Sequence, residues 1–334
     1  MSTLFGTECL YDAARLVFLP VPWDATTSYG QGAALGPDAI LEASQQVDLF
    51  DSEVLRPYET GLYLAPAPVG IADRNQRARL KVEHVRGISP TSKSVDREDC
   101  IQEINEWGAW VNNLVYEQTL RIYESLKNVA VVGGDHSVSY GAIKACAERT
   151  KGMGILHFDA HCDLRNAYEG FQWSHASILR NVMDGIPGIQ KLVQVGVRDF
   201  CEEEWDYARK HQDRIGLFTD SYLKGQLYSG STWAKLCAQM IESLPPLVWI
   251  SFDVDGLDPK LCPSTGTPVP GGLEFSQAMY LIKNLVESGR KIVGFDLVEV
   301  APGTGEWDAN VGARLLYKLA GWMGASQGWC PLRT

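Results

Sequence analysis

The sequence predicts a three-layer α/β protein whose central sheet is mostly parallel and has about eight strands. Two observations support this fold class. Short apolar runs alternate with longer segments of helical periodicity along the 334 residues. The runs are continuously apolar, as expected of strands that helices cover on both faces of a parallel sheet.

Seven apolar runs are the expected strands, and an eighth is expected at Thr60–Ala65. Helices are expected between them, the first beginning near Pro37, because proline is favoured in the first turn of a helix. The seven strands are Arg15–Leu19, Val129–Val132, Gly154–Phe158, Leu192–Val197, Ile215–Phe218, Leu247–Phe252 and Lys291–Val298. The helices are Asp38–Ser44, Ile101–Lys127, Ser139–Glu148, Ser177–Met183, Glu202–Lys210, Trp233–Leu244, Glu274–Ser288 and Val311–Met323.

One segment, 72–97, fits neither pattern. It is charged, has no clear periodicity and contains Gly87 and Pro90. We interpret it as a long surface excursion rather than a linker, and we expect a single domain over residues 1–334.

The overall composition excludes several classes of protein. Hydrophobic residues make up 45% of the chain and charged residues 21%, which is ordinary for a folded protein. The net charge of −11 argues against a nucleic-acid partner and suits either a cationic substrate or simply solubility. No apolar run reaches the roughly 20 residues that span a bilayer, and the N-terminus does not resemble a signal peptide. The eight cysteines form no CxxC pair, so we expect reduced thiols and a cytoplasmic location.

The segment ILHFDAHCDLRN carries the sharpest chemical signal. Asp159, His161 and Asp163 are spaced by two, so their side chains share one face of an extended chain. Three polar groups facing an apolar core are costly unless a charged partner meets them, and a metal ion is such a partner. Cys162 alternates to the opposite face and is expected to pack behind the site.

Two further clusters follow buried strands. LVWISFDVDGLDP contains Asp253 and Asp255, and NVAVVGGDHSVSYG contains Asp135 and His136. Taken alone, each has an ordinary explanation, because an aspartate after a strand often forms a turn or caps a helix. Together with the first cluster they place polar groups at the carboxyl ends of three strands, where open α/β sheets bind ligands.

The combined donor set contains four carboxylates and two imidazoles. Oxygen-rich donors without thiolate suit Mn²⁺ or Mg²⁺ better than structural Zn²⁺. Six ligands are too many for one open catalytic ion but suit two ions that share carboxylates. Two ions roughly 3.5–4 Å apart can activate a water without a serine, cysteine or lysine nucleophile. The six residues are His136, Asp159, His161, Asp163, Asp253 and Asp255.

Four sequence blocks resemble the signatures of the arginase–agmatinase–formiminoglutamase family of ureohydrolases. They are GGDHSVSYG, DAHCDLRN, SFDVDGLDPKLCPSTGTPVPGGL and GFDLVEVAP, and VPWDATTSYGQGAALGPDAILEAS near the N-terminus extends the resemblance. The resemblance implies the arginase/deacetylase-like fold and hydrolysis of a guanidino group to urea and an amine. It also implies two Mn²⁺ ions per chain, with Ni²⁺ or another divalent ion as the alternative, and a homo-oligomer, either a trimer or a hexamer.

The resemblance also implies individual roles. Glu299 in DLVEVAP matches the glutamate that receives the guanidinium, and His175 in QWSHAS matches a proton-shuttling histidine at the site mouth. Thr267 matches a wall residue near the metals, and Asp163 would handle a proton of the metal-activated water and help to pass it to the departing amine. The first-metal ligands would be His136, Asp159, Asp163 and Asp253, the second-metal ligands His161 and Asp255, and the bridging ligands Asp159 and Asp253.

The loop after the DAHCD block bears on the tail of the substrate. Arginases have an asparagine for an α-carboxylate where this chain has Arg165, and an acidic residue for an α-amine where it has Cys201. The DLR…YEG…SHAS pattern resembles bacterial agmatinases instead, which favours agmatine, whereas formiminoglutamases continue DLR differently. Arg165 keeps acidic-tailed substrates such as guanidinobutyrate open, or it forms a structural salt bridge, with Glu169 as the expected partner. Guanidinopropionate, guanidine and formiminoglutamate are the other alternative substrates.

Three aromatic residues of the same loop have two interpretations. Tyr168, Phe171 and Trp173 either form a rim for a cationic tail or pack on a neighbouring loop. Two other classes of function stay open. A single-zinc deacetylase on the related fold would not need both His136 and Asp255, and a non-catalytic homologue would be expected to have lost a ligand.

Overall fold

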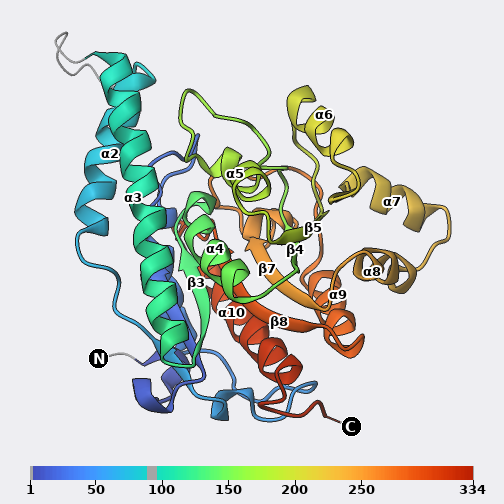
Figure 1. The fold of residues 1–334 in the computed structure, drawn as a ribbon. Helices are drawn as coiled ribbons and strands as arrows, with labels where there is room; N and C mark the ends of the chain where they lie inside the picture. Colours follow the sequence, from blue (N-terminus) through green and yellow to red (C-terminus); the bar gives the residue numbers. More distant parts are fainter. Residues whose placement is uncertain (1–2, 89–95, 334) are drawn as a thin grey trace.

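The computed structural model describes residues 3–88 and 96–333, and Figure 1 shows its architecture. A sheet of eight parallel strands lies at the centre, in the order β2-β1-β3-β8-β7-β4-β5-β6. The predicted α/β fold class is therefore confirmed. The strands are β1 (Leu16–Val21), β2 (Leu62–Leu64), β3 (Asn128–Gly133), β4 (Met153–Phe158), β5 (Ile189–Val195), β6 (Ile215–Phe218), β7 (Leu247–Asp253) and β8 (Lys291–Val298).

Apolar side chains on the two faces of the sheet form two separate cores. In β1, Leu16 and Phe18 pack into one core, and Val17 and Leu19 pack into the other, as the alternation of a strand requires. Helices α1, α8, α9 and α10 cover the first face, and α3, α4 and α5 cover the second. The helices are α1 (Gly36–Ser44), α2 (Ile71–Val85), α3 (Arg97–Glu124), α4 (Tyr140–Arg149), α5 (Ile178–Gly185), α6 (Glu202–Lys210), α7 (Asp220–Tyr228), α8 (Trp233–Glu242), α9 (Phe275–Glu287) and α10 (Trp307–Ser326).

Two of these helices were not expected. The view that segment 72–97 lacks periodicity is wrong for its first half, because α2 occupies it and packs along α3 (Figure 1). The buried positions of α2 follow a helical spacing, but two of them are Asn75 and Ala78, which weaken the apolar pattern. The other helix, α7, buries only Leu223, so it carries almost no periodic signal. The rest of the segment includes residues 89–95, which lie outside the described chain.

The four central strands position the polar clusters. They are neighbours in the order β3-β8-β7-β4, and their carboxyl ends reach the same edge of the sheet. The register aligns Phe158 of β4 with Phe252 of β7, and Asp253 with Val298 of β8. The residues that follow these strands therefore converge at one place.

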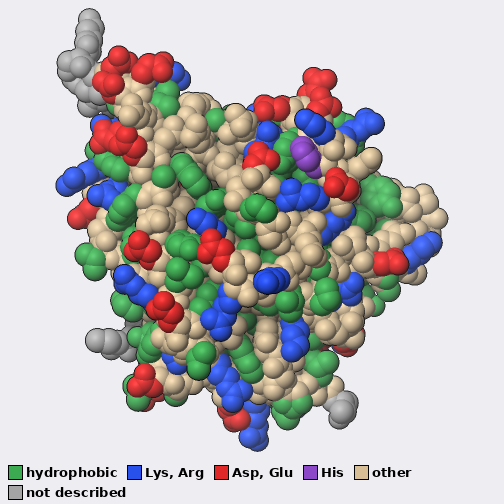
Figure 2. Space-filling model, viewed as in Figure 1, with side chains coloured by type: hydrophobic (Ala, Val, Ile, Leu, Met, Phe, Trp, Pro, Cys, Tyr) green, Lys and Arg blue, Asp and Glu red, His purple; other side chains and the backbone are tan. Residues whose placement is uncertain are grey.

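No helix in the described residues is long and apolar enough to cross a membrane. The face of the protein seen in Figure 2 carries interspersed acidic and basic side chains rather than a continuous basic surface. A nucleic-acid partner would need such a basic surface.

Candidate metal centre and active site

The six predicted metal ligands come together at the carboxyl ends of the strands. One group surrounds His136, whose Nδ1 lies 3.2 Å from Asp159 Oδ2, 3.0 Å from Asp163 Oδ2 and 3.6 Å from Asp253 Oδ2. These four side chains are almost completely buried. An imidazole nitrogen that faces three carboxylates is a suitable donor set for a hard divalent cation.

A second group surrounds His161. Its Nδ1 lies 3.0 Å from Asp255 Oδ2 and 3.4 Å from Asp159 Oδ1. Asp159 therefore takes part in both groups, with one carboxylate oxygen directed at each. A carboxylate in this arrangement can bridge two ions.

The turns after the strands hold these carboxylates in place. Asp159 Oδ1 accepts a hydrogen bond from the His161 N–H at 2.6 Å, and Asp253 Oδ1 accepts one from the Asp255 N–H at 2.8 Å. The Ala160 N–H donates to Asp255 Oδ1 at 2.9 Å and so ties the β4 turn to the β7 turn. The turns approach so closely that a Cβ on Gly256 would lie 2.5 Å from the Asp159 nitrogen, which requires glycine there.

The charge of the cluster is strongly unbalanced. Burial raises the pKa of Asp253 well above its usual range, and the neighbouring charges of Asp255 and Asp159 add to the effect. Burial and the Asp159 charge likewise raise the pKa of Asp163 to about 7. Among the described residues, no lysine or arginine forms an ion pair with these aspartates. The site therefore fits bound cations, which would supply the missing positive charge.

Hydrogen bonds behind His136 fix the orientation of its ring. Asp296 Oδ1 accepts from the Ser251 hydroxyl at 2.7 Å, so the Ser251 oxygen is left to accept from His136 Nε2–H at 2.8 Å. Trp249 Nε1 donates to the other Asp296 oxygen at 2.6 Å. His136 Nδ1 therefore faces the aspartates, the position from which it could bind a metal ion.

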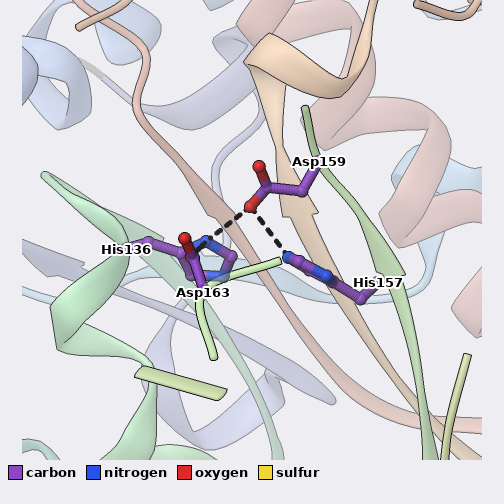
Figure 3. Close-up of side chains that lie close together, drawn as sticks. All are labelled: His136, His157, Asp159 and Asp163. Atoms are coloured by element: carbon purple, nitrogen blue, oxygen red, sulfur yellow. Dashed lines mark hydrogen bonds and ion pairs between the residues drawn. The ribbon is translucent and has the colours of Figure 1, made fainter. Parts of the chain in front are cut away.

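His157 is a site residue that the sequence interpretation missed. Figure 3 shows it on the opposite side of Asp159 from His136, and its Nε2 lies 2.9 Å from Asp159 Oδ2. Gln194 Nε2 donates to the Cys162 carbonyl at 2.7 Å, which fixes the amide orientation, and also to His157 Nδ1 at 3.1 Å. His157 Nδ1 is thus an acceptor, and Nε2 carries the hydrogen that Asp159 accepts. His157 lies among possible ligands but acts here as a donor that orients Asp159.

Glu299 follows β8 and lies beside the first group. Its Oε1 accepts from the His136 N–H at 3.0 Å, and its backbone carbonyl accepts from Thr265 Oγ1 at 2.8 Å. Its φ of 63° is in the left-handed region, which is rare for a residue with a side chain. Burial, followed by the charge of Asp135, raises the pKa of Glu299 well above its usual value.

A cavity of about 360 Å³ leads from the surface to the cluster. His161 and Asp163 lie at its floor, and the predicted residues Arg165, His175 and Thr267 line its wall. The N-terminal segment contributes Ser28 and Tyr29, which the sequence interpretation did not identify. The other lining residues are Tyr168, Ala176, Asp199, Phe200, Glu204, Gly266, Pro268 and Val269.

The ring of His175 lies between hydroxyl groups from the N-terminal segment. Its Nδ1 is 3.5 Å from Thr26 Oγ1, and its Nε2 is 3.3 Å from Ser28 Oγ. Burial lowers the pKa of His175 to about 3, and the nearby positive charges of His161 and Arg86 lower it further. His175 is therefore neutral in this environment.

Arg165 has a salt-bridge partner, but not the expected one. Its Nε lies 3.6 Å from Glu204 Oε2, and its guanidinium lies 5.2 Å from the centre of the Tyr168 ring. Glu169, the predicted partner, instead pairs with Arg86, with 2.7 Å between Oε2 and Nε. The expectation of an Arg165–Glu169 pair is wrong because Glu204 comes from a helix that is distant in sequence but adjacent in space.

The aromatic residues of the loop divide between the two interpretations. Tyr168 lines the cavity, whereas Phe171 is fully buried and Trp173 packs edge-on against Tyr140 with 5.0 Å between ring centres. Cys162 is fully buried in the core, as expected of a residue behind the site. Of these three loop residues, Tyr168 is thus the one that a ligand in the cavity can contact.

Buried carboxylates and imidazoles at strand ends, below a cavity, define an α/β enzyme with a candidate metal site. A model of the arginase family matches residues 14–321 of the chain. An N(1)-aminopropylagmatine ureohydrolase of Thermus thermophilus is 33% identical over 332 residues, which cover 98% of this chain and 97% of that protein. An agmatinase of Bacillus cereus is 29% identical, with coverage of 87% and 85% respectively.

The fold comparison agrees with the sequence comparisons. The crystal structure of an agmatine ureohydrolase of Thermoplasma volcanium has a TM-score of 0.76 at 22% identity and covers 98% of this chain and 96% of its own. The chain belongs to the arginase family and is a ureohydrolase, a hydrolase that acts on the C–N bond of a guanidino group. The family resemblance and the predicted enzyme class are therefore confirmed, and the family match argues against the deacetylase alternative.

Proposed function

We propose that this ureohydrolase acts on a guanidino substrate with a cationic tail, and that agmatine is hydrolysed to putrescine and urea. The observation that carries this proposal is the charge of the cavity. Its lining includes Asp163, Asp199 and Glu204, whereas Arg165 is the one lysine or arginine among the described lining residues. Because Arg165 already faces Glu204, it is not a free cation for a substrate carboxylate. An agmatinase and an agmatine ureohydrolase among the similar proteins support this choice.

We propose that two divalent ions, Mn²⁺ in the native enzyme, occupy the two groups of ligands. When bound, the ions would supply an activated water and positive charge to offset the buried carboxylates. The first ion would be held by His136, Asp159, Asp163 and Asp253, and the second by His161 and Asp255, with Asp159 and Asp253 shared between them.

The surrounding side chains would bind the guanidinium and move protons. Glu299 Oε1 accepts a hydrogen bond from the His136 N–H. Oε2 lies beside Gly266, a residue of the cavity wall, and would accept the guanidinium N–H groups of a substrate there. Asp163 lines the cavity and can hold a proton of the attacking water and return it to the leaving amine. His175 lines the cavity with a hydroxyl group near each ring nitrogen, and these hydroxyls would pass protons between the ring and solvent. Thr267 forms part of the wall.

A panel of candidate substrates tests the proposal on manganese-loaded enzyme, through release of urea from the guanidino compounds and of formamide from formiminoglutamate. The panel contains agmatine, N(1)-aminopropylagmatine, arginine, guanidinobutyrate, guanidinopropionate, guanidine and formiminoglutamate. We expect the highest kcat/KM for a substrate with a cationic tail. A tenfold preference for guanidinobutyrate or guanidine would overturn the substrate proposal, and hydrolysis of none of the seven would favour a non-catalytic homologue.

N(1)-aminopropylagmatine is a second candidate because a further hollow adjoins the cavity. The two share Phe200, and the second is lined by Phe200, Cys201, Glu202 and Trp205. The rings of Phe200 and Trp205 stack with 5.8 Å between their centres. An aromatic pair beside a carboxylate suits a second ammonium group. Glu202→Gln should then raise KM for N(1)-aminopropylagmatine and leave KM for agmatine unchanged, and an equal effect on both would exclude this subsite.

We also propose a cytoplasmic homo-oligomer, a trimer or hexamer, in which residues 1–334 of each chain form one domain. Light scattering after size-exclusion chromatography would give the number of chains. A monomeric mass would contradict the proposed assembly, and two separate unfolding transitions of the metal-free chain would contradict the single domain.

A further inference from the structure

We propose that Arg86 is a positioning residue for His175, and that it acts by joining the two loops that enclose the histidine. The inference rests on the proposed function, because it assumes that His175 moves protons there. The N-terminal entrance loop comprises residues 24–32, and the His175 loop comprises residues 164–175. Arg86 follows directly after α2, the helix that the sequence interpretation did not predict.

The Arg86 guanidinium spans the two loops. Nη1 donates to the Thr27 carbonyl at 2.6 Å, and Nη2 donates to the Thr26 carbonyl at 3.1 Å, both in the N-terminal entrance loop. Nε donates to Glu169 Oε2 in the His175 loop at 2.7 Å. The Arg86 side chain is only 12% exposed, so solvent competes little for these bonds. Only a planar fork of donors can meet three acceptors in this way.

The contacts continue from the two loops to the histidine. Thr26 Oγ1 accepts from the His175 N–H at 3.3 Å and lies 3.5 Å from Nδ1 of the ring. Ser28 Oγ, two residues further along the same loop, lies 3.3 Å from Nε2. Arg86 donates to the carbonyl of Thr26, which carries the first hydroxyl, and to the carbonyl of Thr27, which directly precedes Ser28. Both ring nitrogens of His175 therefore depend on a loop that Arg86 holds.

Helices α2 and α3 anchor the other side of the arrangement. Phe171 of the His175 loop is fully buried against Val82 and Val85 of α2 and Ile104 of α3. Arg79 of α2, seven residues before Arg86, donates to the Asp24 carbonyl at 2.7 Å and to Thr27 Oγ1 at 2.9 Å. Helix α2 thus supports both loops, and Arg86 is the side chain that contacts both.

A variant series separates positioning from general support of the fold. Arg86→Met removes the fork and keeps the length of the side chain, Arg86→Lys keeps the charge alone, and Arg77→Met on the exposed side of α2 is the control. We expect kcat for urea release to fall roughly tenfold to a hundredfold in Arg86→Met, because small misplacements of a catalytic group have effects of this size. Arg86→Lys should recover only part of the loss, and Arg77→Met should match the parent enzyme.

A double variant decides whether the effect passes through His175. If it does, adding Arg86→Met to His175→Ala should lower kcat by less than twofold, because the group that it positions is gone. A full tenfold further loss, or an unchanged kcat in Arg86→Met alone, would overturn the inference. Loss in neither His175→Ala nor Arg86→Met would instead overturn the proposed role of His175.

A measurement without substrate keeps the inference testable if no compound in the panel is cleaved. With ¹⁵N-labelled histidine, the signals of the His175 ring can be assigned by their disappearance in His175→Ala. Arg86→Met should shift these signals and leave unchanged those of His211, which directly follows α6. Unshifted His175 signals would contradict the inference independently of catalysis.

Discussion

The floor of the site and its entrance are built in different ways. The floor consists of side chains that directly follow neighbouring strands, so the register of the sheet and a spacing of two place them. The entrance consists of loops joined by contacts between distant residues, such as Thr26 with Asp135, 109 positions apart, and Thr26 with His175, 149 positions apart. The positions of the floor residues can be predicted from a single sequence, whereas the contacts of the entrance residues cannot. We therefore expect substitutions in the floor to abolish the reaction and those in the entrance to tune it.

The largest effect is expected for the floor residues Asp253 and Asp163. Asp253→Asn removes a carboxylate charge from the buried cluster, so metal content and kcat/KM should both fall by orders of magnitude, and Asp163→Asn should lower kcat similarly. Metal analysis and urea release measure the two effects. Asp258→Asn is the control, because Asp258 is not a predicted ligand and its carboxylate accepts from the backbone N–H and the ammonium group of Lys260 in a nearby turn. If either aspartate variant kept more than about a tenth of the parental turnover, the activation barrier would have risen by less than ~1.4 kcal/mol and the assigned roles would be disproved.

Glu299→Gln should have the next largest effect. Glutamine keeps an oxygen for the His136 N–H but loses the negative charge that would receive the guanidinium. A charge-assisted hydrogen bond contributes about 1.5–3 kcal/mol, so KM should rise roughly tenfold to a hundredfold. Metal content should stay at the parental level. An unchanged KM would place the guanidinium elsewhere.

His157→Leu should weaken metal binding without removing a ligand. Residues that orient metal ligands typically change affinity about tenfold to a hundredfold, and calorimetric titration of the metal-free protein with Mn²⁺ would show this change. His157→Gln places an amide nitrogen near the position of Nε2 and should recover part of the affinity. Equal affinities for the parent and the leucine variant would show that Asp159 needs no donor from His157.

The smallest effect is expected at the entrance, for Arg165→Ala. Because Arg165 is partly exposed and pairs with Glu204 at 3.6 Å, its removal should change KM for agmatine and guanidinobutyrate alike, by a few-fold at most. A selective rise in KM for guanidinobutyrate would show that Arg165 binds a substrate carboxylate. That outcome would break the distinction between floor and entrance, since one entrance residue would then select the substrate.

The same distinction explains how much of the structure the sequence could predict. All eight strands were predicted from apolar runs, and the convergence of the six metal-ligand candidates follows from the polar residues at the ends of β3, β4 and β7. His157 was missed although it alternates with Asp159, because a histidine inside a buried strand is usually a residue of the core. Its role depends on Gln194, which lies 37 positions away on the neighbouring strand.

The entrance was predicted less well because sequence proximity is a poor guide to contact there. Glu169 is four positions from Arg165, yet the partner of Arg165 is Glu204, 39 positions away. Helix α2 was missed because Asn75 occupies one of its buried positions, where it donates to Asp24 at 2.9 Å and helps to shape the entrance. Asn75 thus weakens the apolar pattern of α2 and also connects this helix to the entrance of the site.

The position of β8 has a consequence for the order in which the molecule can assemble. This strand lies between β3 and β7, so the half of the sheet that carries His136 and the half that carries Asp159 and Asp253 meet only through it. Yet β8 is the last of the described strands, and during synthesis it emerges after all the proposed metal ligands. The two halves can collapse separately beforehand, and the paired strands β4 and β7 can already bring five ligand candidates together. His136 cannot join them until β8 pairs with both halves. We therefore expect capture of the ion assigned to His136 to be among the final events of folding, and a chain ending before Lys291 to bind this ion weakly even though it contains every proposed ligand.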